Sequence, residues 1–356
     1  MIKTLEIRNF RCFKDLYVGA LQRFNIIVGE SGSGKTALLE AVFLTAAASP
    51  EIWMRLRQWR GSSNAFRLTG TRASYESLFR DIFYNFEKRR PARVEFSDYD
   101  KKVRSLRISY PSQEKYSIRA AATELPDVSE SEQNVFSVEP IVFAWKSGGK
   151  EQRARVDIKD GKLNFRGFND IYPVWYSSPL INEAQLVAQG FSEVSLKNRS
   201  DSLVRAVTAL YPDILDIGVE SIAGDLALCA STTSLKEKIP IGAMSSGITR
   251  FLTIMVAIAS NPGGVLLIDE FEVGFYYATL PKVLETIVSF CEEQNVQIIA
   301  TTHSYEFMQM LVPLIKERAG TENRFCFLRT ERQGSFCTIR ILENFPSAIE
   351  SVFEVR

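Results

Sequence analysis

The stretch Gly29-Glu30-Ser31-Gly32-Ser33-Gly34-Lys35-Thr36 decides the fold of this chain. It matches the pattern GxxxxGK[ST], in which glycines let successive backbone N–H groups curl around a chain of phosphates. Residues 24–28 before it are apolar and rich in β-branched side chains, as in a buried strand, and residues 35–47 after it predict a helix. We therefore expect Lys35 to reach the β- and γ-phosphates of a nucleotide and the Thr36 hydroxyl to ligate Mg²⁺.

A second apolar strand, further along the chain, ends in two acids. Residues 265–268 read Val-Leu-Leu-Ile and lead directly into Asp269 and Glu270. Adjacent carboxylates repel one another, so a strand seldom ends in such a pair for stability alone. We expect Asp269 to hold Mg²⁺, through water, and Glu270 to be the general base that polarises an attacking water.

Two polar segments complete the candidate site. A third apolar run, residues 298–300, leads into a polar cluster with His303, which can donate a hydrogen bond to a γ-phosphate or to the attacking water. His303 is the only histidine, so a multi-histidine metal site cannot be built from this chain. Ser245, Ser246 and Gly247 open another helix, about 20 residues before the acid-tipped strand, where serine oxygens satisfy free N–H groups.

Composition and patterning define the class of protein. The 356 residues are 46% hydrophobic and 24% charged, which is typical of a globular chain with a core. There is no apolar run of about 18 residues and no apolar signal core at the start, so we expect a cytoplasmic protein without a membrane partner. The five cysteines show neither CxxC nor zinc spacing and are interpreted as reduced thiols.

The order of elements predicts an α/β fold. Alternating segments between residues 92 and 170 indicate antiparallel strands, whereas helices and buried strands alternate from residue 248 onward. We predict a mixed core sheet flanked by helices, plus an antiparallel β-rich subdomain. The core is assigned to residues 1–50 and 200–356, and the inserted helical and β-rich region to residues 51–199.

The motif order GESGSGKT, MSSG, LLIDE and TTHS resembles the ABC-type ATPase heads of the RecF, SMC and OLD group, which are P-loop NTPases. Residues 7–13, IRNFRCF, are similar to the N-terminal strand motif of that group, and residues 271–276, FEVGFY, to a segment of OLD-family AAA ATPases. The resemblance implies ATP and Mg²⁺ as ligands and hydrolysis of ATP to ADP and phosphate. It also implies a dimer in which two heads sandwich two ATP molecules.

Individual residue roles also follow from the resemblance. Ser245, Ser246 and Gly247 of one head would contact the γ-phosphate held by the other, and Arg11 would lie near the nucleotide. The family implies a glutamine on Mg²⁺, for which Gln185 and Gln189 are both candidates. The chain departs from the family at Val273 and Tyr276, where Asn and His are common. We expect neither the SMC coiled coil nor the OLD TOPRIM nuclease domain within these 356 residues.

Three functions are compatible with these features. The first is an OLD-family ATPase that forms a homodimer or higher assembly and serves a separately encoded effector, such as a nuclease or toxin in anti-phage defence. The second is a RecF-like DNA-binding repair ATPase that uses residues 51–110, with 14 Lys and Arg against seven acids. Solvated helix and strand faces explain that basic window equally well. The third, a transporter ATPase subunit, is disfavoured by the IRNFRCF start and the β-rich insertion.

Overall fold

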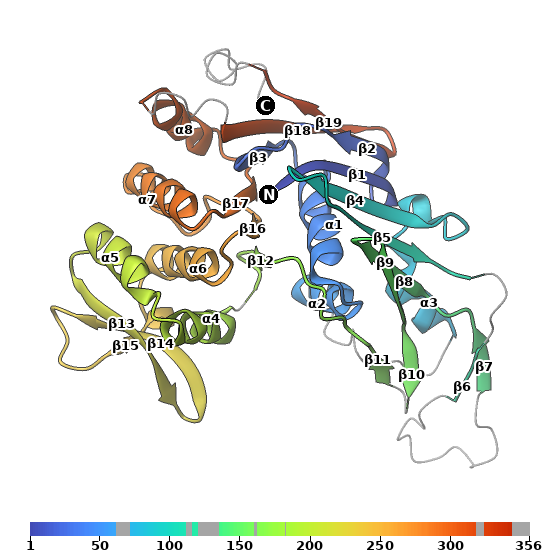
Figure 1. The fold of residues 1–356 in the computed structure, drawn as a ribbon, viewed down its shortest axis with the longest axis horizontal. Helices are drawn as coiled ribbons and strands as arrows, with labels where there is room; N and C mark the ends of the chain where they lie inside the picture. The colour runs from blue at the N-terminus through green and yellow to red at the C-terminus, as the bar shows by residue number, and fades with distance from the viewer. Residues whose placement is uncertain are drawn as a thin grey trace.

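A mixed six-stranded sheet forms the centre of the computed structural model, which describes residues 1–61, 72–111, 116–119, 135–159, 162–181, 183–317 and 324–343 (Figure 1). The strand order is β12-β16-β17-β3-β18-β19. The first five strands run parallel and β19 runs antiparallel to β18. In that order the strands are Val174–Ser177, Val265–Ile268, Gln297–Thr301, Phe24–Val28, Phe325–Gln333 and Phe336–Ile341.

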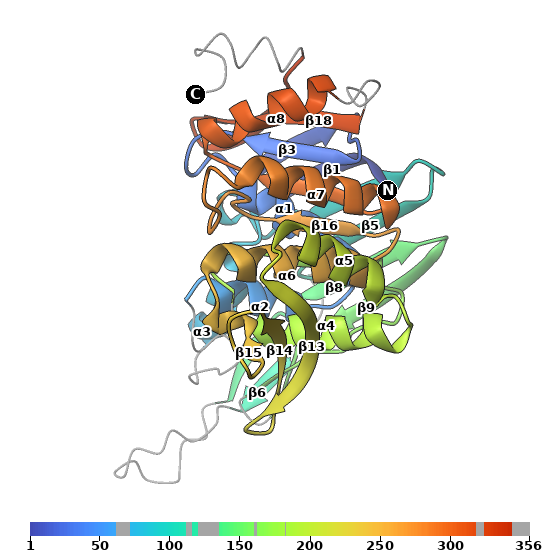
Figure 2. The same cartoon turned by 90° about the vertical axis from the view of Figure 1, so that its left-hand side faces the viewer.

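Helices bury both faces of this central sheet. Helices α6 (Ser246–Ser260), α7 (Leu280–Glu293) and α8 (Tyr305–Glu317) are stacked along one face, and α1 (Lys35–Ala47) covers the other (Figures 1 and 2). Strand side chains therefore alternate between two hydrophobic cores, as Ile26 and Ile27 of β3 do. Burial on both faces explains why the central strands are continuous apolar runs.

A second, antiparallel sheet lies on the far side of α1 (Figure 1). Its order is β2-β1-β4-β5-β8-β9. One face packs toward α1 and the other faces solvent, so buried and exposed residues alternate along β4, as along a half-buried strand. Its strands are Phe13–Val18, Ile2–Phe10, Ala92–Asp98, Val103–Ser109, Val142–Ser147 and Lys150–Arg155.

The remaining described elements extend these two layers. Helices α4 (Ala184–Leu196) and α5 (Ser200–Leu210) pack on α6, and the small sheet of β13 (Ile214–Ile222), β14 (Asp225–Thr232) and β15 (Ile239–Pro240) lies beyond them. Around the antiparallel sheet lie α2 (Glu51–Trp59), α3 (Arg72–Arg80), the pair β6 (Tyr116–Arg119) and β7 (Val135–Val138), the pair β10 (Asp157–Lys159) and β11 (Lys162–Asn164), and the short helix η1 (Tyr84–Phe86). A second short helix, η2 (Ile241–Ala243), precedes α6.

This architecture confirms the predicted α/β class, with a mixed core sheet flanked by helices and a separate antiparallel sheet. The predicted core, residues 1–50 and 200–356, and the predicted insertion, residues 51–199, each contribute strands to both six-stranded sheets or to their edges. Strand β12, from the segment assigned to the insertion, is an edge of the central sheet, whereas β1 and β2 belong to the antiparallel sheet. Within the described ranges, no helix combines the length and apolar character needed to cross a membrane. All five cysteines are free thiols.

Candidate functional site

The glycine-rich loop joins β3 to α1 at the edge where the parallel strands end. Only glycine fits at Gly29, because φ is +142° and a Cβ there would lie 2.4 Å from the carbonyl oxygen of Thr330. Buried Ser33 anchors the loop, since its hydroxyl lies 2.6 Å from the Thr330 hydroxyl on β18 and donates to the Glu30 carbonyl at 2.7 Å. The loop is therefore held in a curled conformation by the sheet beside it.

The Lys35 side chain folds back over this loop. Its ammonium donates hydrogen bonds to the carbonyl oxygens of Gly29 at 2.6 Å and Glu30 at 2.9 Å. Burial lowers the pKa of Lys35, and the negative charges of Asp269 and Glu270 offset part of that effect. The ammonium thus lies at the mouth of the loop, where an anionic phosphate would replace the two carbonyls as its partner.

Asp269, the first of the two acids that follow β16, lies beside Thr36 at the end of the glycine-rich loop. Buried Asp269 follows β16, and its Oδ1 accepts hydrogen bonds from the hydroxyls of Thr36 at 3.2 Å and Thr301 at 2.7 Å. Residues 36 and 269 are far apart in sequence, yet the parallel sheet brings their oxygens together. Hydroxyl and carboxylate oxygens are the donors that Mg²⁺ prefers, so these residues fit the predicted metal.

The second acid projects toward the same pocket from a strained backbone. Glu270 has φ +50°, which is uncommon for a residue other than glycine, and its side chain lines the cavity. Its amide donates to the Thr301 hydroxyl at 2.9 Å, and the Phe271 amide donates to the Thr301 carbonyl at 2.9 Å. Thr301 therefore fixes Asp269 and Glu270 with one side chain.

His303 follows β17 and lines the same cavity as the glycine-rich loop. Its side chain is 60% exposed, and its Nδ1 lies 3.5 Å from Oε1 of Glu272, which also accepts from the His303 amide at 3.3 Å. Glu272 thus holds the segment that carries the imidazole. The exposed ring is free to contact a ligand in the cavity that it lines.

One cavity of about 1320 Å³ collects most of the predicted site residues. Its lining includes the glycine-rich loop, Lys35, Thr36, Asp269, Glu270 and His303. It also includes residues that we did not predict, namely Thr301 at the end of β17, Ser178 after β12, and Trp59, Arg60 and Gly61 after α2. Thr301 opens the TTHS segment, but no role was predicted for it, and no local motif marks the other positions. The pairing of β12, β16 and β17 brings Ser178 and Thr301 to the cavity.

The serine-rich helix start lies outside this cavity. Ser245 is the N-cap of α6 and accepts from the Ile248 amide at 3.4 Å, as predicted for a serine at a helix start. The Ser246 hydroxyl donates to the Gly274 carbonyl at 3.3 Å, and Gly247 packs against the same carbonyl. Ser245 and Ser246 are exposed, and none of the three residues lines the cavity that holds Lys35.

Arg11 is held in an ionic cluster around buried Glu40. Its Nε lies 2.7 Å from Oε2 of Glu40, its guanidinium stacks over the Trp53 ring at 4.5 Å, and its Nη1 donates to Asp81 at 3.4 Å. Glu40 also pairs with Arg60 at 2.6 Å. Burial raises the pKa of Glu40, and the two guanidinium groups oppose that shift. Arg11 is not among the residues that line the cavity, so a nucleotide contact for it stays a prediction.

Neither candidate glutamine lines the cavity. Gln185 donates to Asp225 at 3.2 Å, and Gln189 is exposed on α4. Ser178, just before this segment, does line it. The choice between the two glutamines therefore stays open.

Similarity to known proteins extends over most of the chain. Residues 24–309 match the family model described as "AAA domain, putative AbiEii toxin, Type IV TA system". An ATP/GTP phosphatase of Helicobacter pylori is 21% identical and covers 93% of this chain and 94% of its own. An OLD nuclease of Thermus scotoductus is 36% identical over 20% of this chain and 13% of its own. A solved SMC head bound to the C-terminal winged-helix domain of ScpA shares 13% identity over 97% of this chain and 99% of its own, with a TM-score of 0.49.

Proposed function

Because this chain belongs to the AAA domain family, in the ABC-type group of OLD, RecF and SMC ATPases, we propose that it is a dimeric switch driven by binding and hydrolysis of ATP. One observation carries the proposal. Lys35, Thr36, Asp269 and Glu270 line a single cavity, whereas Ser245, Ser246 and Gly247 at the start of α6, here called the signature residues, lie outside it. A site that holds the phosphates but lacks the signature residues is incomplete in one chain.

Each cavity residue would have a separate role in phosphoryl transfer. Lys35 would exchange the Gly29 and Glu30 carbonyls for the β- and γ-phosphates. Thr36 and Asp269 would hold Mg²⁺, which neutralises developing phosphate charge when bound. Glu270 would polarise the attacking water, and His303 would donate a hydrogen bond near the γ-phosphate. Positioning and charge stabilisation suffice for this reaction, and no covalent enzyme intermediate is needed.

A second copy of the chain would complete the site. In this proposal Ser245, Ser246 and Gly247 of one protomer contact the γ-phosphate held by the other, so that ATP bridges the dimer. The exposure of Ser245 and Ser246 supports this arrangement, because side chains that act in trans must be accessible before the dimer closes. Hydrolysis through Glu270 would then reopen the dimer or a larger assembly built from it.

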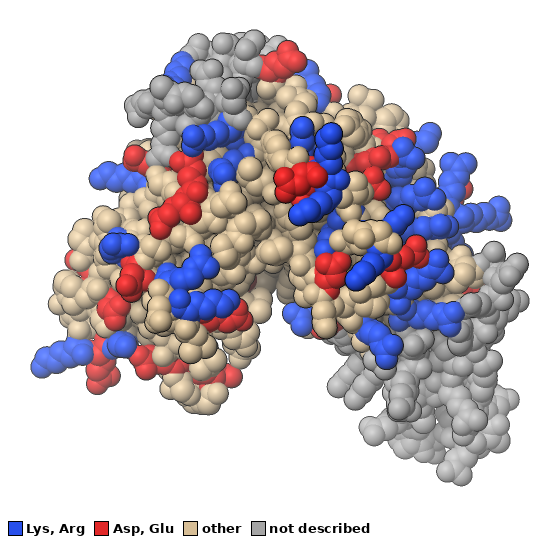
Figure 3. Space-filling view, viewed as in Figure 1, with Lys and Arg blue, Asp and Glu red and all other residues tan. Residues whose placement is uncertain are grey.

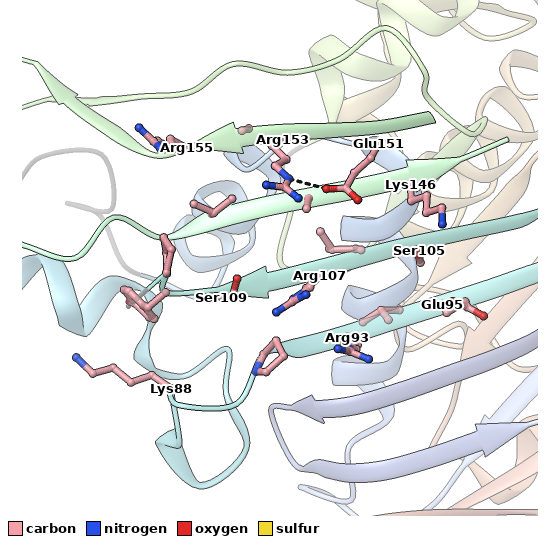
Figure 4. Close-up of a pocket in the computed structure, with 18 of the residues that line it drawn as sticks. Lys88, Arg93, Glu95, Ser105, Arg107, Ser109, Lys146, Glu151, Arg153 and Arg155 are labelled. Carbon is pink, nitrogen blue, oxygen red and sulfur yellow. Dashed lines mark hydrogen bonds and ion pairs between the residues drawn. The ribbon is translucent and has the colours of Figure 1, made fainter. Parts of the chain in front are cut away.

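We propose that the output is passed to a separately encoded effector in the cytoplasm, such as a nuclease or toxin in defence against phage. The family description names a toxin of a toxin–antitoxin system, which agrees with such a role. A DNA-binding ATPase is the alternative, because eight Lys and Arg residues and only two acids line a groove on the antiparallel sheet (Figures 3 and 4).

Steady-state ATP hydrolysis, measured over a range of protein concentrations, tests the shared site. We expect the rate per molecule to rise with concentration, since each cavity needs the α6 start of a partner. Ser246→Arg should lower turnover by about a hundredfold, as loss of a charge-stabilising donor does, while one chain still binds ATP. The matched control is Ser234→Arg, an exposed serine between β14 and β15. A Ser246→Arg protein with wild-type turnover would contradict the proposal.

A further inference from the structure

A groove of about 630 Å³ lies beside the small sheet and shares no lining residue with the ATP cavity. It is lined by the end of α4, the start of α5 and the middle of β13, at the lower left of Figure 1. The order β13-β14-β15 makes β13 an edge strand, with β14 as its one neighbour among the described strands. No step of the proposed ATPase reaction uses this groove.

The register of β13 turns alternate backbone groups away from β14. The two strands are joined by the two-residue loop of Ala223 and Gly224, which both have positive φ, as in a type I′ turn. The pair of residues that flanks such a loop is hydrogen-bonded, and bonding then alternates along the antiparallel strands. The N–H and C=O groups of Ile217, Val219 and Ser221 therefore face outward from the edge of the sheet.

This edge is open to another strand. In the described ranges, no hydrogen bond joins Ile217, Val219 or Ser221 to an element other than β14. Sheets commonly protect such an edge with proline, lysine or a bulge. Residues 216–222 contain neither proline nor lysine, and the bulge of β13 lies before them. Gly218, in the middle of the edge, leaves room for the close approach of another backbone.

The helices give the groove an apolar wall. Leu196, at the C-terminal end of α4, lines the groove with 81% of its surface exposed, and Phe191 and Val204 line it beside Leu196. Successive side chains of a strand point to opposite faces, so every second side chain of an added strand would face these helices. Ile217 and Val219 of β13 already point to that side, where they pack on the core. We therefore expect every second residue of a bound segment to be apolar.

Charge distinguishes between possible occupants of the groove. Two acids line it, Asp201 and Asp216, against one base, Arg205. Glu220 of the same strand pairs with Lys238 at 2.6 Å, whereas no described residue forms an ion pair with Asp201 or Asp216. A strand with basic residues on its outer face would supply partners for these acids. A second copy of β13 would bring the same acids instead, and like charges across a strand pair are destabilising.

We propose that the edge of β13 binds an extended segment of another protein, in which apolar and basic residues alternate. The segment would add a strand to the small sheet. The outward backbone groups of β13 would provide the main-chain hydrogen bonds, and the wall of α4 and α5 would select the alternate side chains. This inference rests on the proposed function only in taking the separately encoded effector as the source of the segment, and the binding itself needs no ATP.

The test is fluorescence anisotropy of a labelled seven-residue peptide in which lysine and valine alternate, measured without nucleotide. A matched peptide has glutamate in place of each lysine. A third peptide keeps the lysines but is N-methylated at every internal residue, so it donates no main-chain hydrogen bond. We expect the lysine–valine peptide to bind at least about tenfold more tightly than either of the others.

Three variants test the individual features of the groove. Leu196→Asp removes the exposed apolar wall and should weaken binding of the lysine–valine peptide at least about tenfold. Its matched control is Leu186→Asp, at an exposed leucine of α4 outside the groove, which should bind like the wild type. Ser221→Pro removes one outward N–H without breaking a bond to β14 and should weaken binding roughly fivefold. Asp201→Asn/Asp216→Asn should reduce the preference for lysine over glutamate.

Equal binding of the three peptides would overturn the inference, and so would wild-type affinity in Leu196→Asp. It would also be overturned if light scattering without ATP showed a dimer that Ser221→Pro dissociates, because a second copy would then occupy the edge. The two proposals fail separately. A chain that hydrolyses ATP normally but binds no peptide would remove only this site, whereas a chain that binds the peptide but hydrolyses no ATP would remove only the proposed ATPase.

Discussion

At the scale of single residues, the candidate site depends on Thr301, which opens the TTHS segment but whose role the sequence does not reveal. Lys35, Thr36, Asp269 and Glu270 were predictable because each belongs to a short pattern whose spacing has a chemical reason. Thr301 was not, since a threonine at a strand end has many possible roles. Only the pairing of β17 with β16 shows that its hydroxyl contacts Asp269 and the amide of Glu270.

The lowered pKa of Lys35 makes ATP binding sensitive to alkaline pH. Below its pKa the ammonium is charged and attracts phosphate. Burial brings that pKa below the ordinary lysine value of about 10.4, so the charge is lost at a lower pH than for a free lysine. We expect the Kd for ATP to rise roughly tenfold per pH unit above the Lys35 pKa.

Isothermal titration calorimetry across the alkaline range measures this dependence. Lys35→Arg is the control, because a guanidinium keeps its charge throughout that range. Its affinity is expected to be weaker than that of the wild type but nearly independent of pH. Parallel curves for the two proteins would show that another group titrates.

At the scale of elements, α6 connects the signature residues at its start to Asp269, which follows β16. Arg250 lies four residues after Ser246 and is buried. Its guanidinium donates to the Ser177 hydroxyl at the end of β12, at 2.7 Å, and to the Asp269 carbonyl at 3.2 Å, and it lies 3.9 Å from buried Glu183. A movement of α6 on dimer closure would therefore be transmitted to the strand ends that hold the acids.

This cluster also stabilises the fold. Arg250→Met would leave the Glu183 carboxylate without its nearby cation, and we expect the free energy of unfolding to fall by about 3 kcal/mol. Adding Glu183→Gln to the Arg250→Met protein should restore part of the lost free energy of unfolding, because the unpaired buried carboxylate is then removed. Urea denaturation of the two single variants and the double variant gives the coupling. Additive effects within error would mean that the pair is not coupled.

The loss of stability in Arg250→Met is expected to depend on pH. Burial raises the pKa of Glu183 above its unfolded value, so the folded protein holds a proton more tightly than the unfolded chain. The stability that this provides is present at low pH and is lost as pH rises through the raised pKa. The deficit of Arg250→Met should therefore be smaller in mildly acidic buffer than at neutral pH.

At the scale of the whole molecule, two sheets are joined by contacts between distant parts of the chain. Buried Gln297 of β17 accepts from the Ile2 amide and donates to the carbonyls of Ile2 and Gln22, each at 2.7 Å. The sequence predicts the strands on either side of this joint from their local periodicity. It does not predict the joint, or the parallel pairing of β12 with β16, because both depend on residues far apart in the chain.

Oligomeric mass in the presence and absence of ATP tests the central claim most directly. Light scattering on Glu270→Gln, which should bind ATP without hydrolysing it, is expected to show one chain without nucleotide and twice that mass or more with ATP. Lys35→Ala should remain a single chain in both conditions, because it cannot hold the phosphates. If Glu270→Gln binds ATP and its mass stays that of one chain, ATP does not close a dimer and the proposed switch is contradicted.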